Sequence, residues 1–188
     1  MERTYKMAGQ LPLNFKYKLY YTDDKKNVKN YEDRIHEIGE FASGEELVSL
    51  LSHLRPLSIQ GTDYHMFKAE IRPLWEDARN RAGGKFIIRT KRGPHTMAVF
   101  TSLVLAMCGG QFGADLEAEL CGVVARARTG GFSVCLWHRT SSDETVKQRL
   151  TERLNEILNT QVPLVFEHEP HDNLLSLVAG LPAAISPQ

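Results

Sequence analysis

Arg126, Arg128 and Trp137 have side chains that suit a flat ligand carrying negative charge. They alternate along a segment typical of two strands, so they are expected on one face of a sheet. An arginine guanidinium is a planar fork that matches a phosphate, and a tryptophan ring stacks on a flat, methylated or aromatic group. The alternative is that Trp137 packs under a helix while the arginines form a solvated face.

Trp75 and Glu76 form a second candidate group, between a proline and a glycine pair that favour an irregular loop. A tryptophan on a loop beside a carboxylate can clamp a ligand. Tyr31 follows the polar stretch Thr22 to Asn30, which also has the composition of a loop. The alternatives are a tryptophan at the edge of the core beside a solvated glutamate, and a tyrosine that docks its own loop. None of these signals is specific alone.

A hairpin must position the arginines and Trp137, because Gly122 to His138 reads as two strands broken by Gly130-Gly131. With these glycines as the loop, the expected cross-strand pairs are Arg128 with Ser133, Arg126 with Cys135, and Val124 with Trp137. The opposite face is apolar and is expected to meet the core; it carries Val123, Ala125, Ala127, Phe132, Val134 and Leu136.

The rest of the chain has the periodicities of an α+β domain. The expected strands are Phe15 to Tyr21, Lys85 to Thr90 and Val162 to Glu169. The first expected helix, Ser43 to Leu54, opens with a capping box formed by Ser43 and Glu46. The second is Met97 to Met107. The third is capped by Ser141 or Ser142 and has an apolar stripe over 146–157. Three lone helices among strands predict helices packed on one face of an antiparallel sheet.

The composition excludes several classes of protein. Lys plus Arg and Asp plus Glu both number 23 among 188 residues, so no overall positive field exists to hold long nucleic acids. No apolar run approaches the roughly 20 residues that span a bilayer. The three cysteines lack CxxC spacing and no signal segment opens the chain, which indicates a reducing, cytoplasmic location. We expect one domain over 11–180, a flexible segment 1–10 and a short tail 181–188.

His168 and His171 lie among acidic residues and could suggest a metal site. A His-x-x-His pair passing from strand to loop points its rings poorly toward one ion, so we expect no metal and no cofactor. An enzyme acting on nucleotides would need a metal cluster or a general base near the phosphates, and neither is recognisable. The sequence therefore favours a binding protein over an enzyme.

Several motifs make the chain resemble the translation initiation factor 4E family, which binds the 5′ cap of messenger RNA. The motifs are Gly61-Thr-Asp63-Tyr64-His-Met-Phe67-Lys68, Ile71-Arg-Pro73-Leu-Trp75-Glu76-Asp77, Arg81-Ala-Gly83-Gly84-Lys85-Phe86, and Cys121-Gly122-Val123-Val124 leading through Arg128 to Trp137. The resemblance runs from Leu11 to about Asp172. It implies a curved antiparallel sheet of about eight strands with three helices on the convex face.

The resemblance also implies roles for the candidate residues. Tyr31 and Trp75 are expected to sandwich a 7-methylguanine base, while Glu76 accepts hydrogen bonds from the guanine edge. Trp137 is expected to touch the N7-methyl group. Arg128 corresponds to the family's phosphate-binding arginine, and Arg126 and Lys85 are expected to assist it.

Several positions depart from the usual family pattern. Tyr31 and Tyr17 stand where tryptophans are usual, as in the subclass called 4E homologous protein. Gly130 and Ser133 replace lysines that bind the triphosphate. The convex partner surface is expected at Leu11, Pro12, Leu13, Val48 and Thr101, with Val48 in place of a tryptophan.

The expected function is therefore binding of the 7-methylguanosine cap of messenger RNA and its recruitment to translation initiation. The partner is expected to be a scaffold 4G-like or 4E-interacting protein on the helical face. The altered surface leaves an alternative open, in which the protein occupies the cap and represses translation. The two alternatives share a cap site and differ in their partners.

Overall fold

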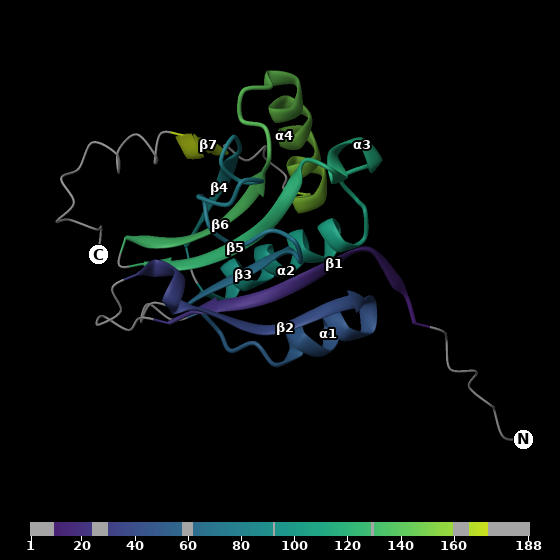
Figure 1. Cartoon of the computed structure of the whole chain (residues 1–188), viewed down its shortest axis with the longest axis vertical. Coiled ribbons are helices and arrows are strands. Elements are labelled where there is room, and N and C mark those ends of the chain that lie inside the picture. Colours follow the sequence, from purple (N-terminus) through teal and green to yellow (C-terminus); the bar gives the residue numbers. More distant parts are fainter. Residues whose placement is uncertain are drawn as a thin grey trace, which may run out of the picture.

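The computed structural model describes residues 10–23, 30–57, 62–91, 93–128, 130–159 and 166–172. Within these ranges seven strands form one antiparallel sheet in the order β2-β1-β3-β5-β6-β4-β7. The strands are β1 Pro12–Thr22, β2 Ile35–Ser43, β3 Asp63–Lys68, β4 Gly84–Thr90, β5 Leu120–Arg128, β6 Gly131–His138 and β7 Glu167–Pro170. The curved antiparallel sheet is confirmed, with one described strand fewer than the eight expected (Figure 1).

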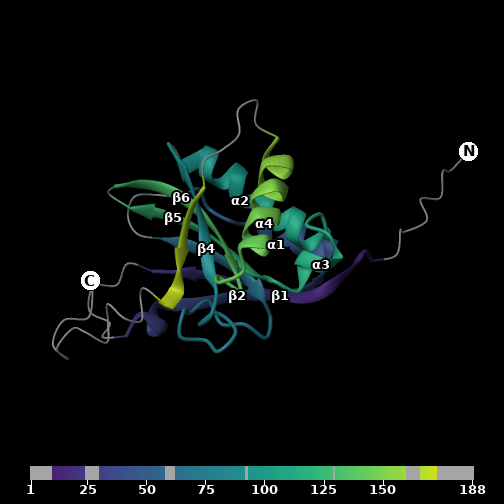
Figure 2. The same cartoon turned by 90° about the horizontal axis from the view of Figure 1, so that it is seen from above.

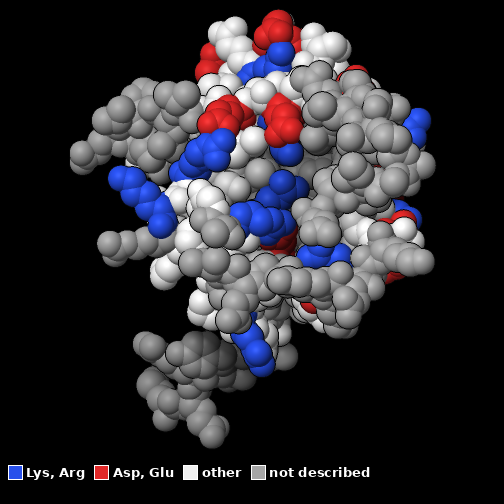
Figure 3. All heavy atoms as spheres, turned by 90° about the vertical axis from the view of Figure 1, so that its left-hand side faces the viewer, with Lys and Arg blue, Asp and Glu red and all other residues white. Residues whose placement is uncertain are grey.

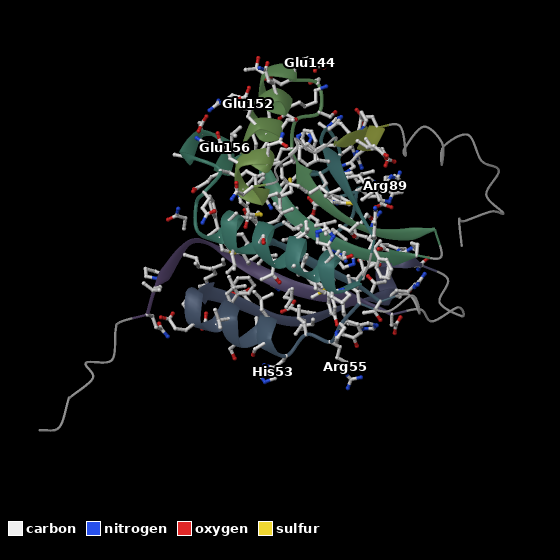
Figure 4. The ribbon with its side chains drawn as sticks, turned by 180° about the vertical axis from the view of Figure 1, so that it is seen from behind. His53, Arg55, Arg89, Glu144, Glu152 and Glu156 are labelled. Atoms are coloured by element: carbon white, nitrogen blue, oxygen red, sulfur yellow. The ribbon has the colours of Figure 1, made fainter. Side chains whose placement is uncertain are left out.

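Helices cover one face of this sheet, as Figures 1 and 2 show from two directions. They are α1 Gly44–Ser52, α2 Gly93–Cys108, the short α3 Ala114–Glu117, and α4 Glu144–Leu158, with a 3₁₀ turn η1 at Tyr31–Arg34. The three expected helices are confirmed as α1, α2 and α4. Seen from behind, they lie in front of the strands, and the labelled glutamates of α4 point away from the sheet (Figure 4).

The first strand and helix form where the sequence pattern predicts. Tyr17 and Leu19 of β1 are buried on the helical side, as their period-2 alternation requires. Ser43 ends β2 and caps α1: its hydroxyl accepts from the Glu46 backbone N–H, and the Glu46 carboxylate accepts from the Ser43 N–H. This reciprocal capping box fixes the chain reversal between strand and helix.

The expected register of the β5–β6 hairpin is wrong by two residues. Arg128 pairs with Gly131, Arg126 with Ser133, Val124 with Cys135 and Gly122 with Trp137. Gly131 has a φ of 130°, a backbone conformation that glycine adopts easily. It pairs with Arg128 as the first residue of β6 instead of lying in the turn. Because the shift is an even number of residues, the same side chains stay on the same faces.

The expected N-cap of α4 is also wrong. Asp143, and neither Ser141 nor Ser142, accepts hydrogen bonds from the backbone N–H groups of Thr145 and Val146. Its charge favours it at this position, since a carboxylate interacts with the positive end of the helix dipole more strongly than a hydroxyl does.

The main core lies between the sheet and the helices. It includes the apolar side chains of β5 and β6 that were expected to meet the core. From the helices it includes Phe100, Leu103 and Val104 of α2 and Leu150 and Leu154 of α4. We call this side the convex face and the opposite side the concave face. Both the helical stripes and the hairpin alternation predicted this core.

No helix in the described ranges is long and apolar enough to cross a bilayer. The flexible start expected over 1–10 and the tail over 181–188 fall almost entirely outside the described residues, as does the part of the expected last strand before Phe166.

Candidate functional site

A second, smaller apolar cluster lies on the concave face. Its buried members are Phe67, Ile71, Cys121, Val124, Cys135 and Trp137, and Trp75 and Ile87 pack against it half-exposed. Trp137 comes from β6 and Trp75 from the loop between β3 and β4, so the fold brings the two tryptophans to one surface. The Trp137 ring meets Phe67 edge-on at 5.4 Å between centroids.

The loop that carries Trp75 and Glu76 has an internal polar brace. Asn80 is fully buried, and its side-chain amide donates to the carbonyl oxygens of Arg72 at 2.8 Å and Leu74 at 2.7 Å. The Asp77 carboxylate accepts from the Arg72 N–H at 3.1 Å. These bonds hold the loop in one shape on either side of Trp75, and sequence analysis missed both braces, although Asn and Asp are the residues that favour such turns.

His171 ties this loop to the last described segment of the chain. Its ring Nδ1 lies 2.7 Å from the Asn80 carbonyl oxygen, and its backbone N–H donates to Gly83. A carbonyl only accepts, so Nδ1 carries the proton. The ring also packs on Trp137 at 4.3 Å between centroids, and burial lowers the pKa of His171. The described end of the strand expected over Val162 to Glu169 is confirmed as β7, and residues 173–175 lie outside the described ranges.

Glu76 and Tyr31 are exposed on the same side of the molecule as this loop. Glu76 makes no side-chain hydrogen bond in the described part of the chain, so its carboxylate is free to accept one. Tyr31 begins η1 and is 39% exposed. The neighbouring Glu32 forms an ion pair with Arg72, which links η1 to the loop of Trp75.

The three predicted phosphate-binding cations differ in what they contact. Arg128 donates from both terminal nitrogens to the two carboxylate oxygens of Asp63, at 2.5 and 2.6 Å, and the Asp63 side chain is completely buried. Lys85 lies 3.0 Å from Glu169 of β7 and is itself buried. Arg126 is half-buried, and its Nε has no hydrogen-bond partner among the described residues.

A fourth cation, Arg89 on β4, was missed by sequence analysis. It pairs with Ser133 in the β4–β6 register and donates to Glu167 of β7 at 2.6 and 2.7 Å. Its alternation with Lys85 and Ile87 was the available signal, because it places all three on the concave face. Figure 3 shows Lys and Arg side chains gathered at the centre of the side toward which the β5–β6 hairpin points, with acidic side chains beside them.

Two histidines meet under the convex edge of the sheet. His138 Nε2 lies 2.9 Å from His168 Nε2, so one ring carries the shared proton and the other accepts it. Burial, with His168 and His171 nearby, lowers the pKa of His138 to about 3. No group of three His, Cys, Asp or Glu side chains suited to a metal ion occurs within the described ranges.

A groove of 820 Å³ opens on the opposite side, between α1, α2 and the start of β1. Leu11, Pro12, Leu13 and Val48 line it, as expected for the partner surface, and Leu11 and Val48 are 67% and 60% exposed. Thr101 does not line it; Leu105, one turn further along α2, does and is 44% exposed. The groove is therefore apolar where a protein partner would insert.

The comparisons with known proteins agree with this geometry. The family model "Eukaryotic initiation factor 4E" matches residues 12–179. A rice protein, Eukaryotic translation initiation factor NCBP of Oryza sativa, is 36% identical over 169 residues, which is 88% of this chain and 73% of the relative. Eukaryotic translation initiation factor 4E-4 of Caenorhabditis elegans is 34% identical over 80% of this chain and 71% of the relative.

Solved structures show the same fold. The C. elegans eIF4E-3 in complex with the 4E-binding protein Mextli and cap analog has a TM-score of 0.82 at 28% identity, covering 89% of this chain and 96% of that one. The Ascaris suum eIF4E-3 in complex with m2,2,7G cap has a TM-score of 0.79 at 29% identity, covering 86% and 92%. With the family model, the relatives and the fold in agreement, this chain belongs to the eukaryotic initiation factor 4E family.

Proposed function

We propose that this protein binds the 7-methylguanosine 5′ cap of messenger RNA and recruits the message to translation initiation through a protein partner. The observation that carries the proposal is the convergence of Trp75 and Trp137 on one concave surface beside the free carboxylate of Glu76. The family consists of cap-binding factors, which act by binding and not by catalysis.

The base is held by aromatic rings on two sides. Methylation at N7 gives guanine a delocalised positive charge, so a ring adds a cation–π interaction of up to ~2 kcal/mol to stacking of ~1–3 kcal/mol. Trp75 supplies one wall, because it is half-exposed on a braced loop. Tyr31 of η1 supplies the other wall, and Trp137 contacts the N7-methyl group from the bottom of the pocket.

Glu76 selects guanine over adenine. Its carboxylate accepts from the N1 and N2 donors of guanine, and its backbone N–H donates to O6. Charge-assisted hydrogen bonds of this kind contribute ~1.5–3 kcal/mol. Adenine lacks the matching donors and would leave the carboxylate covered and unpaired, which costs more than the bonds contribute.

The phosphates of the cap lie along the concave face beyond the base. Arg126 and Arg128 of β5 and Lys85 of β4 supply positive charge there. All three alternate on the same face as Trp137, and Lys85 pairs directly with Trp137 in the register of the sheet.

The partner binds the apolar groove on the convex side. Leu11 and Val48 expose apolar surface there, which suits the apolar side of a helix from a 4G-like or 4E-binding protein. The protein then works in the cytoplasm, where messages are translated.

One observation favours a second function, that of a cap-binding repressor. Val48 lines the exposed groove and has a small side chain, so a partner that needs a large aromatic surface there binds weakly. Translation in a cell-free extract depleted of 7-methyl-GTP-binding proteins distinguishes recruitment from repression. Restored translation of a capped reporter on adding this protein indicates recruitment. Inhibition of an undepleted extract, without restoration of the depleted one, indicates repression.

The cap proposal is tested by tryptophan fluorescence, since Trp75 and Trp137 are the two tryptophans of the chain. Titration with 7-methyl-GTP is expected to quench strongly at micromolar or lower concentration, with unmethylated GTP at least about tenfold weaker because it lacks the cation–π contribution. Equal binding of the two nucleotides, or no binding by a folded sample, would contradict the proposal.

A further inference from the structure

A polar hollow of 390 Å³ opens beside the loop that carries Trp75 and Glu76. Three segments line it: residues 78–82 of that loop, the turn before β5 at 118–119, and residues 139–140, which follow β6. None of its described lining residues belongs to the concave aromatic cluster or to the apolar groove. The proposed cap binding therefore leaves this hollow without a role.

The backbones of the three segments meet at one point. The Cys121 sulfur lies 3.8 Å from the carbonyl oxygen of Arg79 and 4.0 Å from that of Glu119. The backbone N–H of Arg139 donates to the same Glu119 carbonyl at 2.9 Å. Strand pairing thus brings the side chains of Arg79, Glu119 and Arg139, which are distant in sequence, to one hollow.

The hollow carries more positive than negative charge. Arg79 and Arg139 are exposed, and within the described residues neither forms an ion pair. Their guanidinium groups donate only to backbone carbonyl oxygens, of Glu70 and of Ala118. Glu119 is the one acidic side chain in the described lining, so one of the two positive charges stays unbalanced. Two guanidinium groups with unused donors suit a phosphate, because their planar forks match its oxygens.

Thr140 lines the same hollow and carries a hydroxyl beside these arginines. It is half-exposed and lies in the irregular segment between β6 and α4. Asp143 follows it by three residues and Glu144 by four, where α4 begins (Figure 4). Protein kinases select a hydroxyl by the charge pattern around it, and an exposed loop is accessible to them. The pattern after Thr140 is that of a substrate for an acid-directed kinase.

We propose that Thr140 is a phosphorylation site for a kinase that selects acidic residues after its acceptor, and that Arg79 and Arg139 bind the resulting phosphate. The γ-phosphoryl group of a nucleoside triphosphate is transferred to Oγ1 of Thr140. The new P–O bond forms as the bond to the nucleoside diphosphate breaks, and the hydroxyl proton passes to the base of the kinase. This inference does not depend on the cap function.

Ser141 and Ser142 also precede acidic residues, but neither of these described residues lines the hollow. A phosphate on Ser142 would stand beside the Asp143 carboxylate and be repelled by it. The position of the arginines therefore favours Thr140 as the acceptor.

The phosphate would join two parts of the fold. Arg79 belongs to the loop of Trp75, where its backbone N–H donates to the Asp77 carboxylate at 2.9 Å, and Arg139 follows β6. A phosphothreonine adds about 1.5 to 2 negative charges and three acceptor oxygens, enough to bond both guanidinium groups. Phosphorylation therefore stiffens the loop that presents Trp75 and Glu76.

The first test incubates the full chain with ATP and a kinase that requires an acidic residue three positions after its acceptor. Mass spectrometry of the digested protein is expected to place the phosphate on Thr140. Thr140→Val keeps the shape of the side chain and is expected to abolish the modification, while Ser142→Ala, in the same segment, retains it. Absence of phosphate, or phosphate on Ser141 or Ser142 with Thr140 unmodified, overturns the proposal.

The second test asks whether the arginines hold the phosphate. Phosphorus NMR of the modified protein over a pH series is expected to show a second phosphate pKa lowered from about 6 to about 5, because the guanidinium groups favour the dianion. Arg79→Gln and Arg139→Gln are each expected to reverse about half of that lowering. Arg81→Gln changes the same loop outside the hollow and is expected to leave the pKa unchanged.

A variant of opposite sign completes the test. Glu119→Gln removes the like charge from the hollow and is expected to lower the phosphate pKa further. An ordinary phosphate pKa in the modified wild-type protein, insensitive to Arg79→Gln and Arg139→Gln, overturns the arginine site.

Discussion

The two faces of the sheet differ in what their side chains leave unsatisfied. On the convex face, apolar side chains of β5 and β6 close against α2 and α4, and Phe100, Leu103 and Leu150 are completely buried. On the concave face the apolar cluster is small and half-open. Within the described residues, the indole N–H of Trp137 in this cluster and the Nε of Arg126 on the same face are buried without a hydrogen-bond partner. Buried polar groups without partners are costly, so two unsatisfied donors on the same face as an open apolar cluster mark the concave face as a candidate ligand site.

The convex face is expected to carry most of the stability. Phe100→Ala removes a fully buried ring from the main core and is expected to cost about 3–5 kcal/mol in the free energy of unfolding. Urea unfolding measures this loss. A loss below about 1 kcal/mol would mean that the core between α2 and the sheet can collapse around the missing ring, and the contrast between the faces would weaken.

The concave face is expected to carry most of the binding. Trp75→Ala removes one aromatic wall and is expected to weaken 7-methyl-GTP binding by about 100-fold or more, since stacking and cation–π contributions are lost together. Its effect on unfolding is expected to be small, because Trp75 is half-exposed. Fluorescence quenching of Trp137 measures binding in this variant. Retained affinity in a folded Trp75→Ala or Glu76→Gln protein would show that the pocket is placed wrongly.

Both faces also bury histidines whose pKa values are lowered by burial, and His171 is one of them on the concave side. Burial lowers the pKa of His65, on the concave side, to about 4, and that of His138 to about 3. A folded pKa below the unfolded value of about 6.5 means that the unfolded chain binds protons first as pH falls. The contribution of these groups to the free energy of unfolding is therefore fully present well above pH 6.5. It decreases below that pH, by about 2 kcal/mol for each of His65 and His138 at pH 5.

Denaturant unfolding at pH 7.5, 6.0 and 5.0 measures this slope. His138→Gln removes one titrating group and is expected to make the slope shallower, while His65, His168 and His171, whose pKa values are also lowered, keep the rest of it. An identical slope in the two proteins would assign the pH dependence to other groups. The lowered carboxyl pKa of Glu46 and of Glu167 affects stability only at lower pH.

The smallest expected effect is at the capping box. Ser43→Ala removes the hydroxyl that accepts from Glu46 and is expected to cost about 1 kcal/mol of stability, because one N–H at the start of α1 loses its partner. Cap binding is expected to stay unchanged, since α1 lies on the convex side. A loss of 7-methyl-GTP affinity in this variant would show that the two faces are coupled.

Much of the architecture was predictable because it rests on local pattern. The capping box at Ser43, the alternation from Phe15 to Tyr21 and the apolar stripe of α4 each specify an element and its buried face. The hairpin alternation placed Arg126, Arg128 and Trp137 on one face correctly. Its register was wrong because two adjacent glycines can both occupy a turn, and the pairing of whole strands decides between them.

For the candidate site, the sequence predicted which face of the hairpin carries Arg126, Arg128 and Trp137, but it missed Arg89 and did not predict the electrostatics. The sequence alone determined which aromatic and basic side chains face the concave side, because strand alternation is a property of the local chain. Only the tertiary structure decided which cations are free. Asp63 neutralises Arg128, and Glu169 neutralises Lys85, from strands distant in sequence. Ion pairs form between groups that are close in space, and strand order across the sheet, which no local pattern encodes, sets those distances.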